Sequence, residues 1–128
     1  MWMMEGHRLI ASASGQALGA LGFIDPTLLE EEQPPMDFKV TFDMLACVGK
    51  AIQQFNLANL HAKQGQNYPL TKLVQKTSDV HRKLSQAMGH RKGTANAHFR
   101  MMVELLGDTQ TLAREAYVGD APGEPAPR

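Results

Sequence analysis

Apolar residues between positions 95 and 117 recur with the period of an α-helix and fill two adjoining faces of it. One face holds Ala95, Phe99, Met102, Val103, Leu106, Ala113 and Tyr117, and the other holds His98, Met101, Leu105, Leu112 and Ala116. A single neighbour buries only one stripe, so such a helix is either central in a bundle or shared between subunits. Because no other segment obviously covers the second face, we expect a homodimer. Its interface would contain Met101, Leu105, Leu112 and Ala116.

Two further segments have the helical period. The first runs to about residue 64 and carries one apolar stripe, formed by Met44, Leu45, Val48, Ala51, Ile52, Phe55, Ala58 and Ala62. The second begins at Pro69, which suits a first helical position, and ends at Gly89, which suits a left-handed C-terminal residue. Leu57 and Leu60 lie on the opposite face of the first helix. These leucines either pack beneath the N-terminal segment or bind a partner protein.

The N-terminal region has weaker signals. Residues 1–23 give no clean period and are compatible with only a short helix at about 15–21. Asp25 as a cap and Pro26 at the first helical position, with a stop at residues 34–35, indicate one or two helical turns. From 37 to 42, apolar and polar residues alternate as in a strand, but a lone strand lacks a partner. We therefore expect an extended lead-in, with Thr41 capping the helix that follows.

These patterns predict an all-α fold, an antiparallel bundle of three long helices after a short N-terminal helical or extended segment. The expected divisions are an N-terminal segment at 1–35, the helical bundle domain at 36–118 and a tail at 119–128. The tail contains three prolines and two glycines, and we expect it to be disordered.

The net charge is zero, but the charges are unevenly placed. Residues 1–43 hold two basic and seven acidic side chains, whereas residues 69–100 hold seven basic and one acidic. The basic segment could meet nucleic acid, an acidic partner or the acidic N-terminal region of its own chain. Cys47 is the only cysteine, which excludes an intrachain disulfide and fits a reducing compartment. With no run of 18 apolar residues and a poor match to a secretory signal, we expect a cytoplasmic protein.

Motifs for chemistry are missing from the sequence. It has no phosphate-binding loop, nucleophile elbow or dinucleotide-binding fingerprint, and its histidines share no metal-ligand spacing. His81 and His98 lie on or beside apolar stripes, where a hydrogen-bonded core histidine is the usual explanation. We expect no enzyme activity, no cofactor and no metal.

One local similarity concerns the segment from Leu84 to Gly89, followed by Thr94, His98 and Gly107. It resembles the second and third helices of a helix-turn-helix of the LuxR/GerE type. The resemblance implies contacts with the major groove or phosphates. The residues concerned would be Arg91, Lys92, Thr94, Asn96 and Arg100.

The polar arc of the last helix, however, keeps its phase through Gly107 to Glu115, as in one continuous helix. Whether Gly107 ends a helix or lies inside one therefore separates two hypotheses. The first is a small non-enzymatic regulatory or adaptor protein that acts by protein–protein interaction. The second is a DNA-binding transcriptional regulator. In build, the chain is similar to the small helical antiactivators that sequester LuxR-type quorum-sensing regulators, which implies a transcriptional regulator as the partner.

Overall fold

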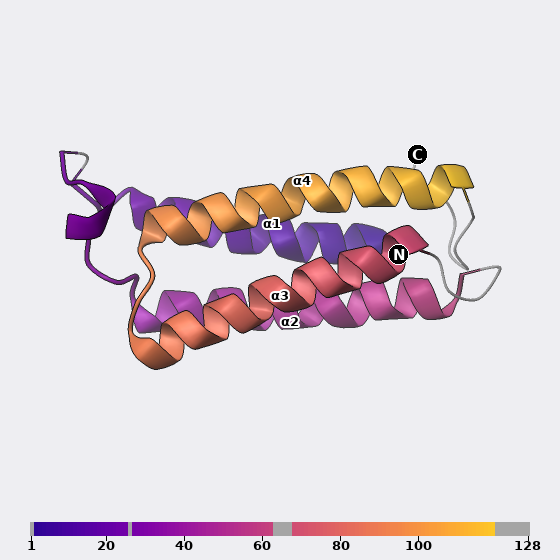
Figure 1. Cartoon of the computed structure of the whole chain (residues 1–128), viewed down its shortest axis with the longest axis horizontal. Helices are drawn as coiled ribbons and strands as arrows, with labels where there is room; N and C mark the ends of the chain where they lie inside the picture. The colour runs from indigo at the N-terminus through magenta and orange to yellow at the C-terminus, as the bar shows by residue number, and fades with distance from the viewer. Residues whose placement is uncertain (1, 26, 63–67, 120–128) are drawn as a thin grey trace.

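The computed structural model describes residues 2–25, 27–62 and 68–119, and within them it contains four α-helices and no strand. The helices are α1 (Trp2–Leu21), α2 (Phe38–Leu60), α3 (Tyr68–His90) and α4 (Ala95–Gly119), with one 3-10 turn, η1 (Glu30–Glu32), between α1 and α2. Successive helices run antiparallel (Figure 1). The all-α fold is confirmed, but the bundle has four long helices where three were expected. None of the described helices is long and apolar enough to cross a membrane.

The unexpected helix is α1, which extends far beyond the short helix expected at 15–21. Its inward positions are three or four residues apart but largely small, which hides the helical period. The buried residues are Met3, Gly6, Leu9, Ile10, Ala13, Ser14 and Ala17. Small side chains let the neighbouring helices approach closely, and the ring of Phe55 from α2 lies where a side chain at Gly6 would project.

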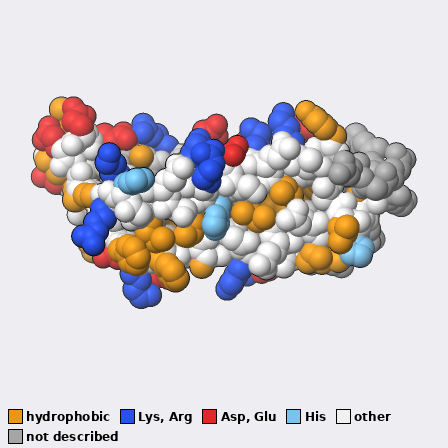
Figure 2. Space-filling model, turned by 60° about the horizontal axis from the view of Figure 1, so that its bottom comes forward, with side chains coloured by type: hydrophobic (Ala, Val, Ile, Leu, Met, Phe, Trp, Pro, Cys, Tyr) orange, Lys and Arg blue, Asp and Glu red, His pale blue; other side chains and the backbone are white. Residues whose placement is uncertain are grey.

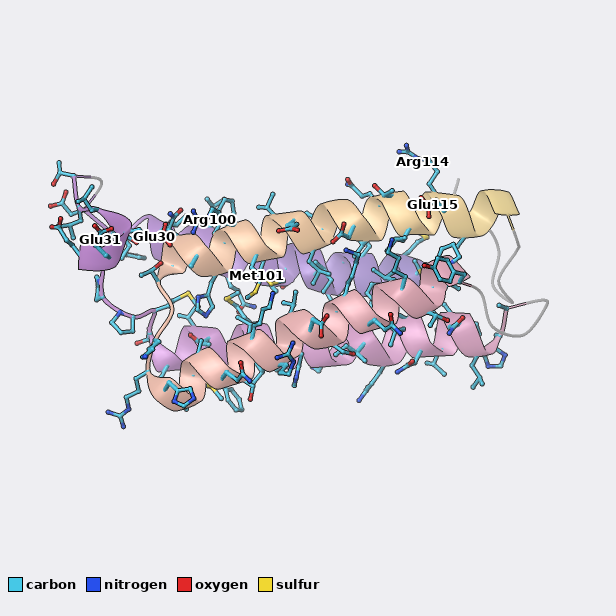
Figure 3. All side chains as sticks on the ribbon, in the orientation of Figure 1. Glu30, Glu31, Arg100, Met101, Arg114 and Glu115 are labelled. Carbon is cyan, nitrogen blue, oxygen red and sulfur yellow. The ribbon has the colours of Figure 1, made fainter. Side chains whose placement is uncertain are left out.

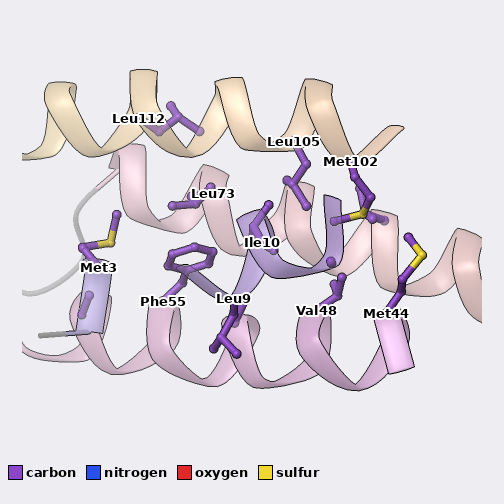
Figure 4. Packing of buried hydrophobic residues seen from close by; sticks show 14 of the residues in the cluster. Met3, Leu9, Ile10, Met44, Val48, Phe55, Leu73, Met102, Leu105 and Leu112 are labelled. Carbon is purple, nitrogen blue, oxygen red and sulfur yellow. The ribbon is translucent and has the colours of Figure 1, made fainter. Parts of the chain in front are cut away.

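Each helix packs against two others. α1 and α3 both lie against α2 and α4, so the four helices enclose one core. Figure 4 shows Leu105 and Leu112 of α4 facing Ile10 and Phe55 in that core. α1 and α3 therefore together cover the apolar faces of α4.

The start of α2 differs from the expected extended lead-in. Residues 38–42 are helical because Asp37 caps the helix, with its Oδ1 accepting the N–H groups of Lys39 and Val40 at 2.9 and 3.3 Å. Thr41 is not the cap but a first-turn residue, whose hydroxyl donates to the Asp37 carbonyl at 3.0 Å. The alternation in the sequence arises because Phe38 and Phe42, one turn apart, are exposed on the helix surface.

Of the one or two helical turns expected between Asp25 and residues 34–35, the described residues contain one, the 3-10 turn η1. The Asp25 carboxylate accepts hydrogen bonds from the backbone N–H and the hydroxyl of Thr27, at 2.9 and 2.8 Å, in a local turn. Pro26 lies outside the described residues, as does the expected disordered tail apart from Gly119, which ends α4. The Met36 N–H donates to the Gly93 carbonyl at 2.9 Å, which fixes the connection against the α3–α4 loop.

Candidate protein-interaction surface

The second apolar face of α4 is not available to another subunit. Leu105 is 2% exposed, and Leu112 and Ala116 are also buried in the core. Met101 is half-buried between α4 and α3 (Figure 3). It lines a groove with Val80 of α3. The expected dimer interface through these four residues is therefore wrong, because α1 and α3 already cover them within the chain.

Three of the large apolar side chains left uncovered on α2 lie on the side opposite its buried stripe. Phe42, Leu57 and Leu60 are 53%, 37% and 75% exposed. We call the surface formed by Phe42, Ala46, Gln53, Leu57 and Leu60 the outer face of α2; all five residues are exposed. A helix held on one side by a bundle core needs no large apolar residues on the other side.

The N-terminal segment does not cover Leu60, so the expectation that it shields this side chain is wrong. It forms α1 and packs on another side of α2, where Gln16 Nε2 contacts Cys47 Sγ at 3.7 Å. Near the end of α2, the Trp2 ring stacks on His61, with ring centroids 4.7 Å apart. The placement of Leu57 and Leu60 is thus compatible with the second alternative, a docking surface.

A groove of about 350 Å³ opens where α2 begins and α3 ends. We call it the linker-end groove; its lining residues are Pro35, Met36, Phe38, Thr41, Ala87, Met88, Arg91 and Lys92. Figure 2 views the molecule from the side of α2 and α3 and shows hydrophobic side chains gathered at one end, next to basic ones. A second groove, of about 530 Å³, lies across the linker and is lined in part by Phe23, Ile24 and Val40.

Two of the residues expected to contact nucleic acid are hydrogen-bonded to Glu30 of the same chain. Arg100 donates to Glu30 Oε1 at 2.8 Å, and Asn96 Nδ2 donates to Glu30 Oε2 at 3.1 Å (Figure 3). A third, Thr94, caps α4 through its hydroxyl, which accepts the Ala97 N–H at 3.1 Å. The acidic N-terminal region therefore meets the basic segment of its own chain, which confirms that alternative for Glu30.

The other two, Arg91 and Lys92, are exposed at the rim of the linker-end groove, with no ion pair to a carboxylate of the described residues. Gly107 lies inside α4, with helix on both sides of it. α3 and α4 are antiparallel neighbours in the bundle, whereas the two helices of a helix-turn-helix cross at roughly 90–120°.

His98 is the buried histidine of the bundle, only 3% exposed. Its Nδ1 lies 2.9 Å from the Thr94 carbonyl oxygen, to which it donates, which confirms a hydrogen-bonded core histidine. Burial lowers the pKa of His98 below the ordinary value, because a charged imidazolium would lose its hydration. Gly93, with φ +94°, lies against this ring, and a Cβ there would come within 2.2 Å of His98 Cε1.

The described residues contain no group of three or more His, Cys, Asp or Glu side chains that could hold a metal ion. Comparison with protein-family models, with curated proteins and with solved structures finds no match to this chain. Function therefore has to be inferred from the surfaces and the build of the bundle.

The alternation at 37–42 predicts an extended segment, so the sequence pattern does not identify Phe38 and Phe42 as surface residues of a helix. The available signal was Asp37, a good N-cap after two prolines, followed by phenylalanines at i and i+4.

Proposed function

We propose that this protein is a small, non-enzymatic regulatory or adaptor protein that acts by binding another protein through the outer face of α2. The observation that carries the proposal is the exposure of Phe42, Leu57 and Leu60 on one side of a helix whose other side completes the core. Aromatic and aliphatic side chains that a fold leaves exposed along one face are typical of a protein-binding surface.

A transcriptional regulator is the class of partner that we propose, on the similarity in build to the small helical antiactivators. Such a partner would fit a binder that lacks catalytic groups, because sequestration requires only a complementary surface. An amphipathic helix of the partner could lie along α2 and place its apolar side chains between Phe42 and Leu60.

DNA binding by residues 84–107 is the less favoured candidate. Glu30 neutralises Arg100 and occupies Asn96, so two residues of the expected contact set would have to leave an intrachain partner. The continuity of α4 through Gly107 also favours the protein-binding proposal. Any affinity for duplex DNA should therefore come from phosphate contacts and should fall steeply between roughly 50 and 200 mM salt.

Photo-crosslinking from the outer face tests the proposal. A benzophenone amino acid at position 60, introduced in the native host, should crosslink one defined protein that mass spectrometry identifies. The purified partner should then bind the wild-type chain in a fixed stoichiometry. The outer-face variant, Phe42→Ser/Leu57→Ser/Leu60→Ser, should bind it at least about tenfold more weakly, a loss of about 1.4 kcal/mol.

Position 18 on α1 provides the matched control, since Leu18 is a large aliphatic residue with 55% exposure on another helix. The same photoreactive residue there should not crosslink that partner, and Met4→Ser/Leu18→Ser should bind it normally. Equal crosslinking from both positions, or unchanged binding by the outer-face variant, would overturn the proposal in favour of nonspecific adhesion or another surface.

A further inference from the structure

We propose that a second copy of this chain binds at the linker end of the bundle, where each copy places its acidic turn, residues 28–32, in the linker-end groove of the other. This inference goes beyond the proposed function, because it uses a surface separate from the outer face of α2. It starts from two oppositely charged surfaces of the same molecule.

The first surface is the linker-end groove. Phe38 and Met88 give it an apolar lining, and Arg91 and Lys92 place two cations at its rim. The backbone that carries these cations is fixed, since the N–H groups of Arg91 and Lys92 donate to the carbonyls that close α3, at 3.3 and 2.9 Å. Within the described residues neither cation forms an ion pair, so the groove combines apolar lining with unneutralised positive charge.

The second surface is the acidic turn, which has the complementary composition. Leu29 is 58% exposed, and Glu31 and Glu32 are exposed and form no ion pair with another described residue. Glu30 is bound to Arg100, which holds the turn against the start of α4 (Figure 3). The turn therefore presents one apolar side chain and two free carboxylates from a fixed position.

Both surfaces lie at the same end of the bundle (Figures 1 and 2). Two copies that meet at this end about a two-fold axis can form both contacts at once, with the leucine on the apolar lining and the carboxylates near the cations. Opposite charges select this pairing over like-charged alternatives. Such an interface is small, so we expect a dissociation constant in the range of about 1–100 µM.

Sedimentation equilibrium of the full chain across this range tests the proposal. The wild type should associate to a dimer, and association should weaken as salt is raised. Arg91→Glu/Lys92→Glu and Glu31→Lys/Glu32→Lys should each lower the association constant at least about tenfold. An equimolar mixture of the two variants should form a heterodimer, because the reversed charges are complementary at both contacts. Circular dichroism should be unchanged, since all four residues are exposed.

The matched control is Lys72→Glu/Lys83→Glu, which makes the same charge change at exposed positions of α3 outside the groove and should dimerise normally. Phe38→Ser should weaken the dimer without reversing any charge. A wild-type chain that remains monomeric at about 300 µM, well above the expected dissociation constant, would overturn the proposal. A dimer that neither reversal weakens, or a mixture that remains monomeric, would also overturn it. A monomer that binds an acidic, leucine-containing peptide at the groove would assign the groove to a different protein.

Discussion

The interior around Phe55 and the linker end of the bundle differ in how far their side chains are packed and hydrogen-bonded. In the interior, the Phe55 ring fills the space beside Gly6, and the buried hydroxyls of Ser14 and Thr77 donate to carbonyls of their own helices at 3.1 and 2.7 Å. At the linker end, large apolar side chains such as Phe23 and Phe38 are exposed.

This difference distinguishes the buried residues that the fold requires from the exposed residues that it does not require. Every buried group named in the interior has a packing or hydrogen-bonding partner, so folding alone accounts for it. Folding does not explain the exposed apolar and charged groups at the linker end or the exposed apolar groups on the outer face of α2. They are therefore the parts of the molecule to which we assign binding.

The largest expected effect tests the interior side of this comparison. Leu105→Glu places a carboxylate in a core position without a partner and should lower the free energy of unfolding by about 3–5 kcal/mol, measured by urea denaturation. Val103→Glu on the same helix is the control, because Val103 is 47% exposed and its variant should lose less than about 1 kcal/mol. Comparable losses for the two variants would show that the buried and exposed faces of α4 are wrongly assigned.

The contact between Gly6 and Phe55 predicts the next largest effect. Gly6→Ala would bring a Cβ within 2.2 Å of the Phe55 ring, so the ring must move and stability should fall by about 1–3 kcal/mol. Gly15→Ala should instead increase stability, since nothing lies within 4 Å of a Cβ there and alanine favours a helix by about 1 kcal/mol relative to glycine. A stabilising Gly6→Ala variant would mean that α1 does not pack as closely on α2 as the structure shows.

The burial of His98 predicts a pH dependence. Its pKa is lowered in the folded state from the ordinary value of 6.5, chiefly by desolvation, so the unfolded chain binds a proton that the folded chain does not. The free energy of unfolding should therefore decrease as the pH falls below 6.5 and should show no contribution from His98 well above it. Urea denaturation at several pH values should give a shallower decrease for His98→Gln.

His90 is exposed at the end of α3, so His90→Gln is the matched control and should keep the wild-type pH dependence. Identical profiles for wild type and His98→Gln would contradict the assignment of this effect to the buried ring.

The sequence predicted three helices and their buried stripes because each has a regular run of large apolar residues. It did not predict α1, whose inward positions alternate large residues with Gly6, Ala13 and Ala17. Small residues signal a close helix contact only when the neighbour is known, and Phe55 is distant in sequence. The same missing helix produced the incorrect dimer interface on α4, since a covered face and a free face have the same sequence pattern.

The candidate surfaces were predictable to different degrees. Leu57 and Leu60 stood out because they lie opposite a clear apolar stripe, and their position on a single helix follows from its period. The contact of Glu30 with Arg100 joins residues far apart in the chain, so charge asymmetry could only suggest it. The linker-end groove requires the ends of α2 and α3 to meet, and no local pattern encodes that meeting.

The central claim is that the outer face of α2 is not needed by the fold, and the stability of the outer-face variant measures this directly. Urea denaturation of Phe42→Ser/Leu57→Ser/Leu60→Ser should show an average loss below about 2 kcal/mol per substituted side chain, since each of the three residues is partly exposed to solvent in the folded chain. An average loss per side chain as large as that of Leu105→Glu, about 3–5 kcal/mol, would contradict the claim and place these side chains in the folding core.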